Sequence, residues 1–349
     1  MPPWGGGWIP AAPKPGVIPL QPLGVGAVIG GAFATFRHYW KPLVGVILAV
    51  QGLALLVMTA ATGIAVAAVY DNLVTVFNLE AGQGADSADV TALVLAFVPV
   101  GLVTLVTMLL AVAMINALCS AVVQEAVLGR PATFGAMWRR SWSRMRAVLG
   151  TVMLSGLIAG GPMLVLYAIG VPLLIVTSDG SGSPTGLVLL VLGALLCAPV
   201  SAWLGVKFSL APTAAVCEDL GPVTALRRSS RLVDGAWWRV FGIMMLVYTI
   251  ALAVSYAIQI PFTFIGTFAL VPMMLEAGNS SPDPVTLVIG VAVYVVSLLI
   301  GGVVSGLFQF GYPQLALALI YVDQRMRKEN LAAALIASSA VPTQVREQT

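Results

Sequence analysis

Long apolar runs separated by short polar segments make up most of this 349-residue chain. A helix needs about 20 apolar residues to cross a hydrocarbon core about 30 Å thick. Six runs reach that length: Leu43–Ala68, Leu93–Leu118, Val148–Val176, Leu187–Val206, Val240–Ala269 and Val285–Leu317. They do not alternate apolar with polar residues, as the strands of a membrane barrel do. The pattern therefore predicts an all-α integral membrane protein with six transmembrane helices.

Amphipathic segments precede the first, third and fifth predicted spans. They are centred on Trp40, Trp142 and Trp238, and in each the apolar residues recur at helical spacing beside basic residues. An apolar face with basic flanks is typical of a helix that lies in the membrane interface. We therefore expect three parallel helix-pair units, each with a cytoplasmic interfacial helix, an outward span and a returning span.

Composition limits what else the chain contains. It is 59% hydrophobic and 9% charged, against about 25% charged residues in soluble domains, so no large aqueous domain is expected. Residues 1–16 are rich in proline and glycine, which predicts a disordered tail. We assign residues 17–335 to the membrane domain and residues 336–349 to a flexible cytoplasmic tail.

Charge is distributed one-sidedly. The net charge is only +3, but all 17 lysines and arginines lie on one side of the predicted membrane. The connections on the other side contain no lysine or arginine, and their charged residues are all acidic: Asp71, Glu80, Asp86, Asp89, Asp179, Glu276 and Asp283. By the positive-inside rule, both termini are expected in the cytoplasm and the protein in the cell (plasma) membrane. None of the three cysteines is placed to reach the oxidising side, so no disulfide is expected.

Basic clusters are the best candidates for a binding function. Arginine offers planar, bidentate contacts to phosphate, which suits anionic membrane lipids or an acidic membrane or cytoplasmic protein partner. The candidate contacts are Arg139, Arg140, Lys207, Arg227, Arg228 and Arg231. The alternative, that these residues only set topology and anchor the interface, stays open. We do not expect a nucleic-acid partner.

Two further groups are assigned structural roles. The pairs Gly156/Gly160 and Gly302/Gly306 match the small-xxx-small pattern that allows close contact between membrane helices. Asp323, Arg325 and Arg327 form a polar group at the end of the last span. We expect Asp323 to pair with a basic residue of a neighbouring unit and so close the bundle.

The sequence lacks the combinations of residues that usually carry out catalysis. His38 is the single histidine, no serine is paired with it, and neither metal-ligand spacing nor a phosphate loop occurs. We therefore predict no catalytic, metal-binding or cofactor-binding residues. Coupled transport usually leaves ionisable residues inside the spans, and none lies near mid-depth here.

Three stretches carry a resemblance to a known family. They are PKPGVIPLQPLGVGAVIGGAF near the N-terminus, AWLGVKFSLAPTAAVCEDLGPVTALRRSSRLVDGAWWRVFGI over residues 202–243 and LALALIYVDQRMRKENLAAAL over residues 315–335. Over residues 13–335 the chain resembles the actinobacterial six-span proteins grouped with the glycerophosphoryl diester phosphodiesterase membrane domain. Ser230 and Asn330 depart from the pattern, where an aromatic residue and a glycine are usual. The resemblance implies the six-span membrane part without a catalytic domain, and that part has no agreed activity.

Three function classes follow from these observations. We favour a non-enzymatic scaffold or lipid- and partner-binding module that acts through a basic cytoplasmic face. A permease or lipid-handling channel without proton coupling is the first alternative. A membrane enzyme of unknown type is the second.

Overall fold

The computed structural model describes residues 21–77, 86–128, 134–177, 185–277 and 284–329, which form helices and short connections without a strand. Six of the helices in this described part of the chain are long and apolar enough to cross a membrane. They are α2 (Trp40–Ala68), α4 (Ser87–Leu128), α5 (Phe134–Thr177), α6 (Thr185–Phe208), α9 (Trp237–Ala277) and α10 (Pro284–Glu329). The predicted all-α membrane architecture is confirmed. The predicted tails, 1–16 and 336–349, lie outside the described residues.

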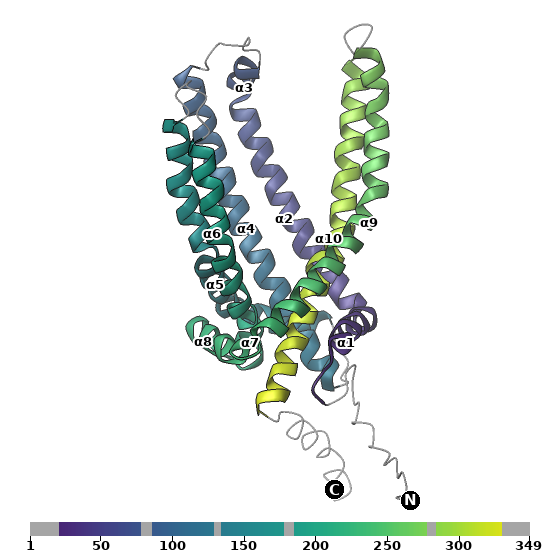
Figure 1. Ribbon diagram of the computed structural model, residues 1–349. Coiled ribbons are helices and arrows are strands. Elements are labelled where there is room, and N and C mark those ends of the chain that lie inside the picture. The colour runs from purple at the N-terminus through teal and green to yellow at the C-terminus, as the bar shows by residue number, and fades with distance from the viewer. Residues whose placement is uncertain (1–20, 78–85, 129–133, 178–184, 278–283, 330–349) are drawn as a thin grey trace, which may run out of the picture.

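Four short helices complete the described chain: α1 (Val25–His38), α3 (Tyr70–Phe77), α7 (Ala211–Cys217) and α8 (Pro222–Val233). Helices α1, α7 and α8 lie at one end of the bundle, together with the last turns of α4 and α10, and we call this the basic end (Figure 1). Helix α3 lies at the opposite end. The pairs α2/α4, α5/α6 and α9/α10 each run away from the basic end and return to it.

The predicted interfacial helices have different outcomes. Helices α1 and α8 are separate elements ahead of the first and fifth spans, whereas the segment around Trp142 forms the first turns of α5 without a break. Helix α8 ends at a turn in which Gly235 has φ +78°, a conformation that glycine adopts without steric strain. Between Trp138 and Gly150 there is neither glycine nor proline, so α5 continues directly into the span.

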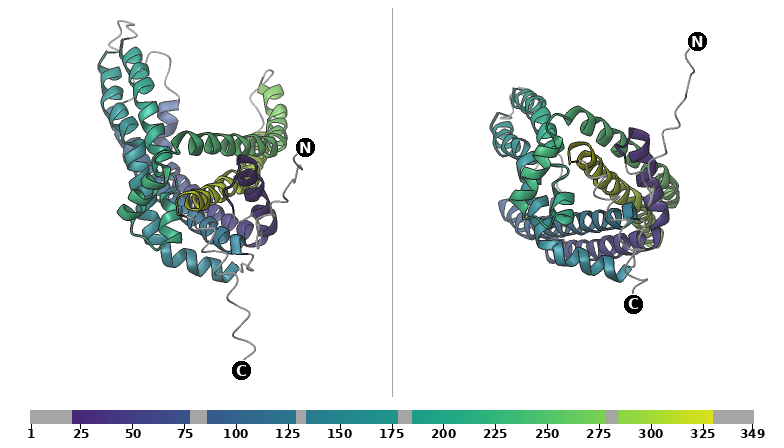
Figure 2. Two further views of the ribbon diagram at one scale, coloured as in Figure 1. Left: turned by 60° about the horizontal axis from the view of Figure 1, so that its bottom comes forward. Right: turned by 90° about the horizontal axis from the view of Figure 1, so that it is seen from below.

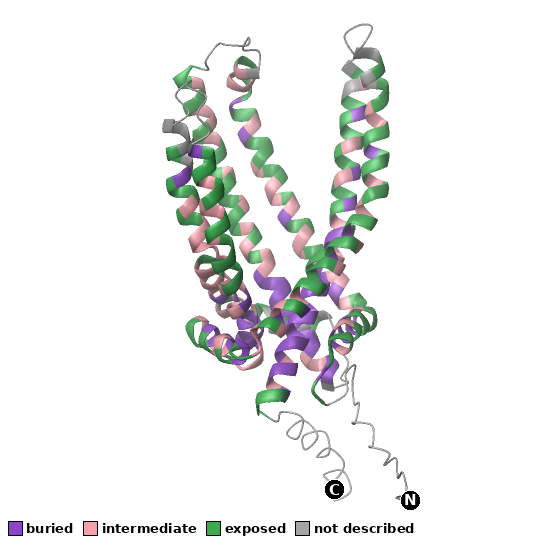
Figure 3. Cartoon of the chain, viewed as in Figure 1, coloured by how far each residue is buried: buried purple, intermediate pink, exposed green. Residues whose placement is uncertain are grey.

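Buried residues are concentrated at the basic end, whereas the far halves of the long helices are largely exposed (Figure 3). No residue in the most apolar stretch of α4, α5 or α6 is buried, against 22% of that stretch in α2, α9 and α10. Apolar side chains exposed along a span are compatible with hydrocarbon. The chain therefore packs tightly at one end and offers most of its remaining surface to lipid.

Helix α10 is the centre of this packing. Viewed from the basic end, its last turns lie among α1, α4, α8 and α9 (Figure 2). Tyr312 is buried, stacks on Phe308 with ring centroids 4.8 Å apart, and donates from its hydroxyl to the Ile29 carbonyl of α1 at 3.4 Å. Gly311 leaves room for α2, since a Cβ there would lie 3.0 Å from Ile47 Cδ1.

Asp323 of α10 joins three segments at the basic end. The side chain is fully buried and forms an ion pair with Arg239 at the start of α9 and another with Arg327 at 3.0 Å. It also accepts a hydrogen bond from the Leu23 backbone N–H at 2.8 Å. Both arginines in turn donate to the Leu23 carbonyl, at 2.6 and 2.9 Å. This Asp323 cluster fixes the segment before α1 against α9 and α10.

The structure corrects the expected partner of Asp323. Arg239 belongs to the same helix-pair unit, and the link to another unit is made by the backbone of Leu23. Arg325 does not join this cluster. Its Nε lies 3.0 Å from Glu329 and 3.5 Å from Glu218. Residues 323 and 327 are one helical turn apart and share a face, whereas residue 325 points elsewhere.

The predicted glycine contacts are made at one of four positions. Among the described residues, no atom lies within 4 Å of a Cβ built at Gly156, Gly160 or Gly302, whereas one at Gly306 would lie 2.6 Å from Gln51 Nε2. Close approaches also occur at glycines outside the motif. A Cβ at Gly290 would lie 2.9 Å from the Ala269 carbonyl oxygen, where α10 meets α9. Spacing alone did not show which face of each helix meets a neighbour.

We expect Asp323→Asn to lower the free energy of unfolding by about 3 kcal/mol, because two guanidinium groups lose a buried counter-charge. Unfolding by denaturant titration in mixed micelles measures this loss. Asp234→Asn is the matched control, since the Asp234 side chain is 62% exposed and 3.7 Å from Lys207, and it should cost less than about 1 kcal/mol. Equal losses in the two variants would contradict the role of the Asp323 cluster.

Candidate functional site

A pocket of about 480 Å³ lies at the basic end between α5, α6 and α8. Three of the predicted lipid-contacting cations, Lys207, Arg227 and Arg231, line it. The rest of its wall is apolar apart from Ser230, and consists of Leu154, Ile158, Trp203, Leu204, Phe208, Val223 and Leu226. We call it the basic pocket. It combines a cationic rim with an apolar wall drawn from two transmembrane helices.

Helix α8 positions the two arginines. It begins at Pro222, whose fixed φ suits the first turn of a helix. Its buried face includes Ser229 and Leu232, while Arg227 and Arg231 are exposed. Residues four apart on a helix are neighbours on its surface, so both guanidinium groups lie on the same side of α8. Neither side chain has an ion-pair partner within the described part of the chain.

Lys207 is the third cation, at the end of α6. Its ammonium lies 4.9 Å from the centroid of the Trp203 ring and 3.7 Å from an Asp234 carboxylate oxygen. The Lys207 backbone carbonyl accepts a hydrogen bond from the Ser229 hydroxyl at 2.8 Å, which ties α8 to the end of α6. The Trp203 carbonyl accepts from the Trp237 indole at 3.3 Å. These two hydrogen bonds hold in place the backbone that carries the cationic rim.

Arg228 belongs to the interior and does not line the basic pocket. It donates from Nε and Nη2 to both oxygens of Glu218, at 2.9 to 3.0 Å, and its Nη1 lies 2.5 Å from Glu329. Tyr321 also donates to Glu218. Hydrogen bonds to Glu329 and then Glu218 raise the pKa of the Arg228 guanidinium above its usual value. This network joins α8 to α10 and gives Arg228 a structural role, while the predicted lipid contact at Arg228 stays a prediction.

The cluster in the first turns of α5 lies apart from the basic pocket. Arg139 is exposed and is not among the pocket residues. Arg140 lies in the same helix, and its side chain is outside the described residues. Arg144 forms an ion pair with Asp219 at 2.7 Å. Asp219 has φ 55° between α7 and α8, a conformation in which aspartate is enriched.

Sequence reasoning missed the apolar half of the basic pocket. Leu154 and Ile158 of α5 and Leu204 of α6 come from continuous apolar runs in which no periodicity marks one face. Glu218, the centre of the Arg228 network, was also missed. Its one signal was an acidic residue on the side of the membrane where cations predominate.

The described residues contain no group of three or more histidine, cysteine or acidic side chains able to hold a metal ion. No family model, curated protein or solved structure matches this chain. The resemblance to the six-span family therefore stays an expectation from sequence motifs. What the geometry offers is a place where an anion and an apolar chain can be held together.

Substitutions at Arg228 and Arg227 should distinguish a residue of the Glu218 and Glu329 network from a residue of the pocket rim. We expect Arg228→Gln to lower the free energy of unfolding by about 2 kcal/mol, because two glutamates lose charged hydrogen bonds. Arg227→Gln, one residue away and exposed, should change it by less than about 0.5 kcal/mol. Thermal unfolding in detergent compares the two. A loss at Arg227 as large as that at Arg228 would contradict this division.

Proposed function

We propose that this protein is a non-enzymatic, multi-pass protein of the cell membrane that binds an anionic phospholipid in the basic pocket. One observation carries the proposal: Lys207, Arg227 and Arg231 line the same pocket as apolar residues of α5 and α6. A phospholipid has the complementary arrangement, with an anionic phosphate joined to acyl chains. Through that lipid, the protein acts as a membrane scaffold at its basic end.

The chemistry of each part supports this ligand. Guanidinium groups give planar, bidentate contacts to phosphate oxygens, and an ammonium adds a point charge. Beyond the rim, Leu154, Ile158 and Leu204 offer apolar contact along the spans. The volume of about 480 Å³ lies within the range of small-molecule sites, roughly 300 to 1,000 Å³. It accommodates a headgroup and the first part of the acyl chains.

The proposal places the basic end in the cytoplasm. Cations predominate there, and the inner leaflet carries anionic lipids that attract basic segments at about 1 kcal/mol per residue. The same asymmetry places the acidic connections outside. With this orientation, the basic pocket opens at the leaflet where its ligand is concentrated.

Removing the rim charges should release the lipid. The triple variant Lys207→Gln, Arg227→Gln and Arg231→Gln removes about 3 kcal/mol of attraction if the contributions add, which is roughly a hundredfold in affinity. Native mass spectrometry of the purified full chain, titrated with phosphatidylglycerol or cardiolipin, measures the change. The effect should shrink with salt, since exposed charges are screened over about 10 Å at 0.1 M.

The matched control removes three cations from the same end but outside the pocket. Arg37, Lys41 and Arg146 are exposed and do not line it, so their conversion to Gln should leave the affinity within a few-fold. Equal losses in the two triple variants would show a diffuse electrostatic belt in place of a site. Unchanged affinity in both would leave these cations as topology signals.

Orientation is tested separately by thiol labelling of intact cells. In a background without the three native cysteines, Asp86→Cys near the start of α4 should react with an impermeant maleimide. Ser143→Cys in the first turns of α5 should react only after the membrane is permeabilised, because the positive-inside rule places it in the cytoplasm. Labelling of Ser143→Cys in intact cells would reverse the proposed orientation.

A further inference from the structure

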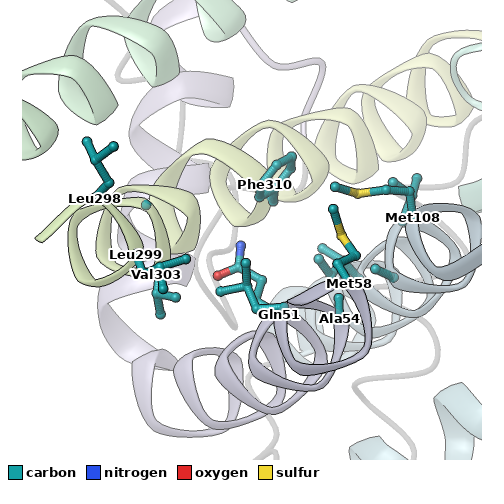
Figure 4. Close-up of a pocket in the computed structure, with 13 residues that line it drawn as sticks. Gln51, Ala54, Met58, Met108, Leu298, Leu299, Val303 and Phe310 are labelled. Atoms are coloured by element: carbon teal, nitrogen blue, oxygen red, sulfur yellow. The ribbon is translucent and has the colours of Figure 1, made fainter. Parts of the chain in front are cut away.

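A second pocket, of about 250 Å³, lies between α2, α4 and α10, away from the basic pocket. Its wall is apolar except for Gln51 of α2 (Figure 4). Met58 of α2, Met108 of α4 and Phe310 of α10 surround the space into which the Gln51 amide points. For comparison, an engineered apolar cavity of about 150 Å³ is large enough to bind benzene. We call this second site the Gln51 pocket.

The pocket lies deep in the hydrocarbon. Gln51 follows Trp40, the first residue of α2, by three helical turns, which is about 16 Å along the axis. A tryptophan at a span end marks the membrane interface, and the hydrocarbon core is about 30 Å thick. Gln51 is therefore near the bilayer midplane. A charged headgroup is strongly disfavoured at that depth, which leaves neutral lipophilic molecules as occupants.

Gln51 also has an unused hydrogen-bonding atom. Its Oε1 is buried and has no hydrogen-bond partner among the described residues. The amide packs against Gly306 of α10, where a Cβ would lie 2.6 Å from Nε2 and 3.2 Å from Oε1. Any side chain at 306 would displace it. A buried acceptor without a donor is unfavourable, and in hydrocarbon there is little water to supply one.

The surrounding residues fit a slender ligand. Met58 and Met108 are unbranched and can adapt to irregular apolar shapes. Gly302 also lines the pocket and leaves open space, because no described atom lies within 4 Å of a Cβ built there. The pocket therefore places the Gln51 amide, with its one unpaired acceptor, beside an adaptable apolar space between three spans.

We propose that the Gln51 pocket binds a long-chain lipid alcohol. A half-turn of the Gln51 amide about its terminal torsion brings Oε1 to the pocket. The neutral hydroxyl then donates a hydrogen bond to Oε1, and the chain of the alcohol lies against Met58, Met108 and Phe310. This goes beyond the proposed function, because the site shares no residue with the basic pocket and takes an uncharged ligand. It also gives the protein a means of holding a neutral lipid between the two leaflets.

The test uses two photoreactive probes that differ at one group. A diazirine-bearing hexadecanol supplies a hydroxyl donor, and its methyl ether has the same chain without the donor. The full chain is reconstituted in phosphatidylcholine vesicles, irradiated with each probe and digested, and labelled peptides are identified by mass spectrometry. The alcohol should label α2, α4 and α10 around the pocket about tenfold more strongly than the ether, as a hydrogen bond of about 1.4 kcal/mol implies.

Three variants test the contribution of the hydrogen bond and that of the apolar wall of the pocket separately. Gln51→Leu keeps the side-chain bulk and should reduce alcohol labelling to the level of the ether. Ala54→Phe fills the pocket and should reduce labelling by both probes. Ala60→Phe, on an exposed face of α2 outside the pocket, should change neither.

Equal labelling by alcohol and ether in the wild type would overturn the assignment of a hydroxyl donor. Labelling that survives Ala54→Phe would overturn the pocket itself. Neither result depends on the basic pocket, since triple replacement of Lys207, Arg227 and Arg231 leaves the Gln51 pocket intact. Failure of the phospholipid titration and failure of the alcohol labelling are therefore distinguishable.

Discussion

The fold depends on one buried carboxylate at the basic end. Asp323 is fully enclosed, and it is compensated by two arginines and a backbone N–H drawn from the segment before α1, from α9 and from α10 itself. A buried charge without such partners would be strongly unfavourable. The segments that supply the partners are therefore held together at this one point. The Arg228 network adds α8 and Glu218, at the end of α7, to the same assembly.

Because the polar links are concentrated there, the rest of the bundle is held mainly by apolar contact. Helices α9 and α10 approach closely at glycines such as Gly290, whereas the centres of α4, α5 and α6 bury no residue. Both candidate pockets follow from this uneven packing. The basic pocket lies where α8 meets two spans, and the Gln51 pocket lies where α2, α4 and α10 diverge from the packed end.

The sequence predicted the spans well, since length and hydrophobicity decide them, and it predicted the separate helices that precede the first and fifth spans. Three of the predicted cationic contacts, Lys207, Arg227 and Arg231, line one pocket, although their binding of lipid stays a prediction. It could not separate Arg228 from Arg227, because adjacent residues on a helix face different directions and only packing shows which one meets Glu218. Nor could it show which face of α5 meets a neighbouring helix, because the apolar run of α5 has no polar face. Gly156 and Gly160 were therefore predicted to allow a close helix contact, but no described atom lies near a Cβ built at either position.

The exposed centres of α4, α5 and α6 have a consequence for how such a chain diverges. A side chain that touches only hydrocarbon has to be apolar but needs no particular shape, so substitutions among Leu, Val, Ile and Phe there are nearly neutral. Residues of the Asp323 cluster and the Arg228 network are coupled, and one cannot change without another. Over time the spans should drift while the basic end stays fixed.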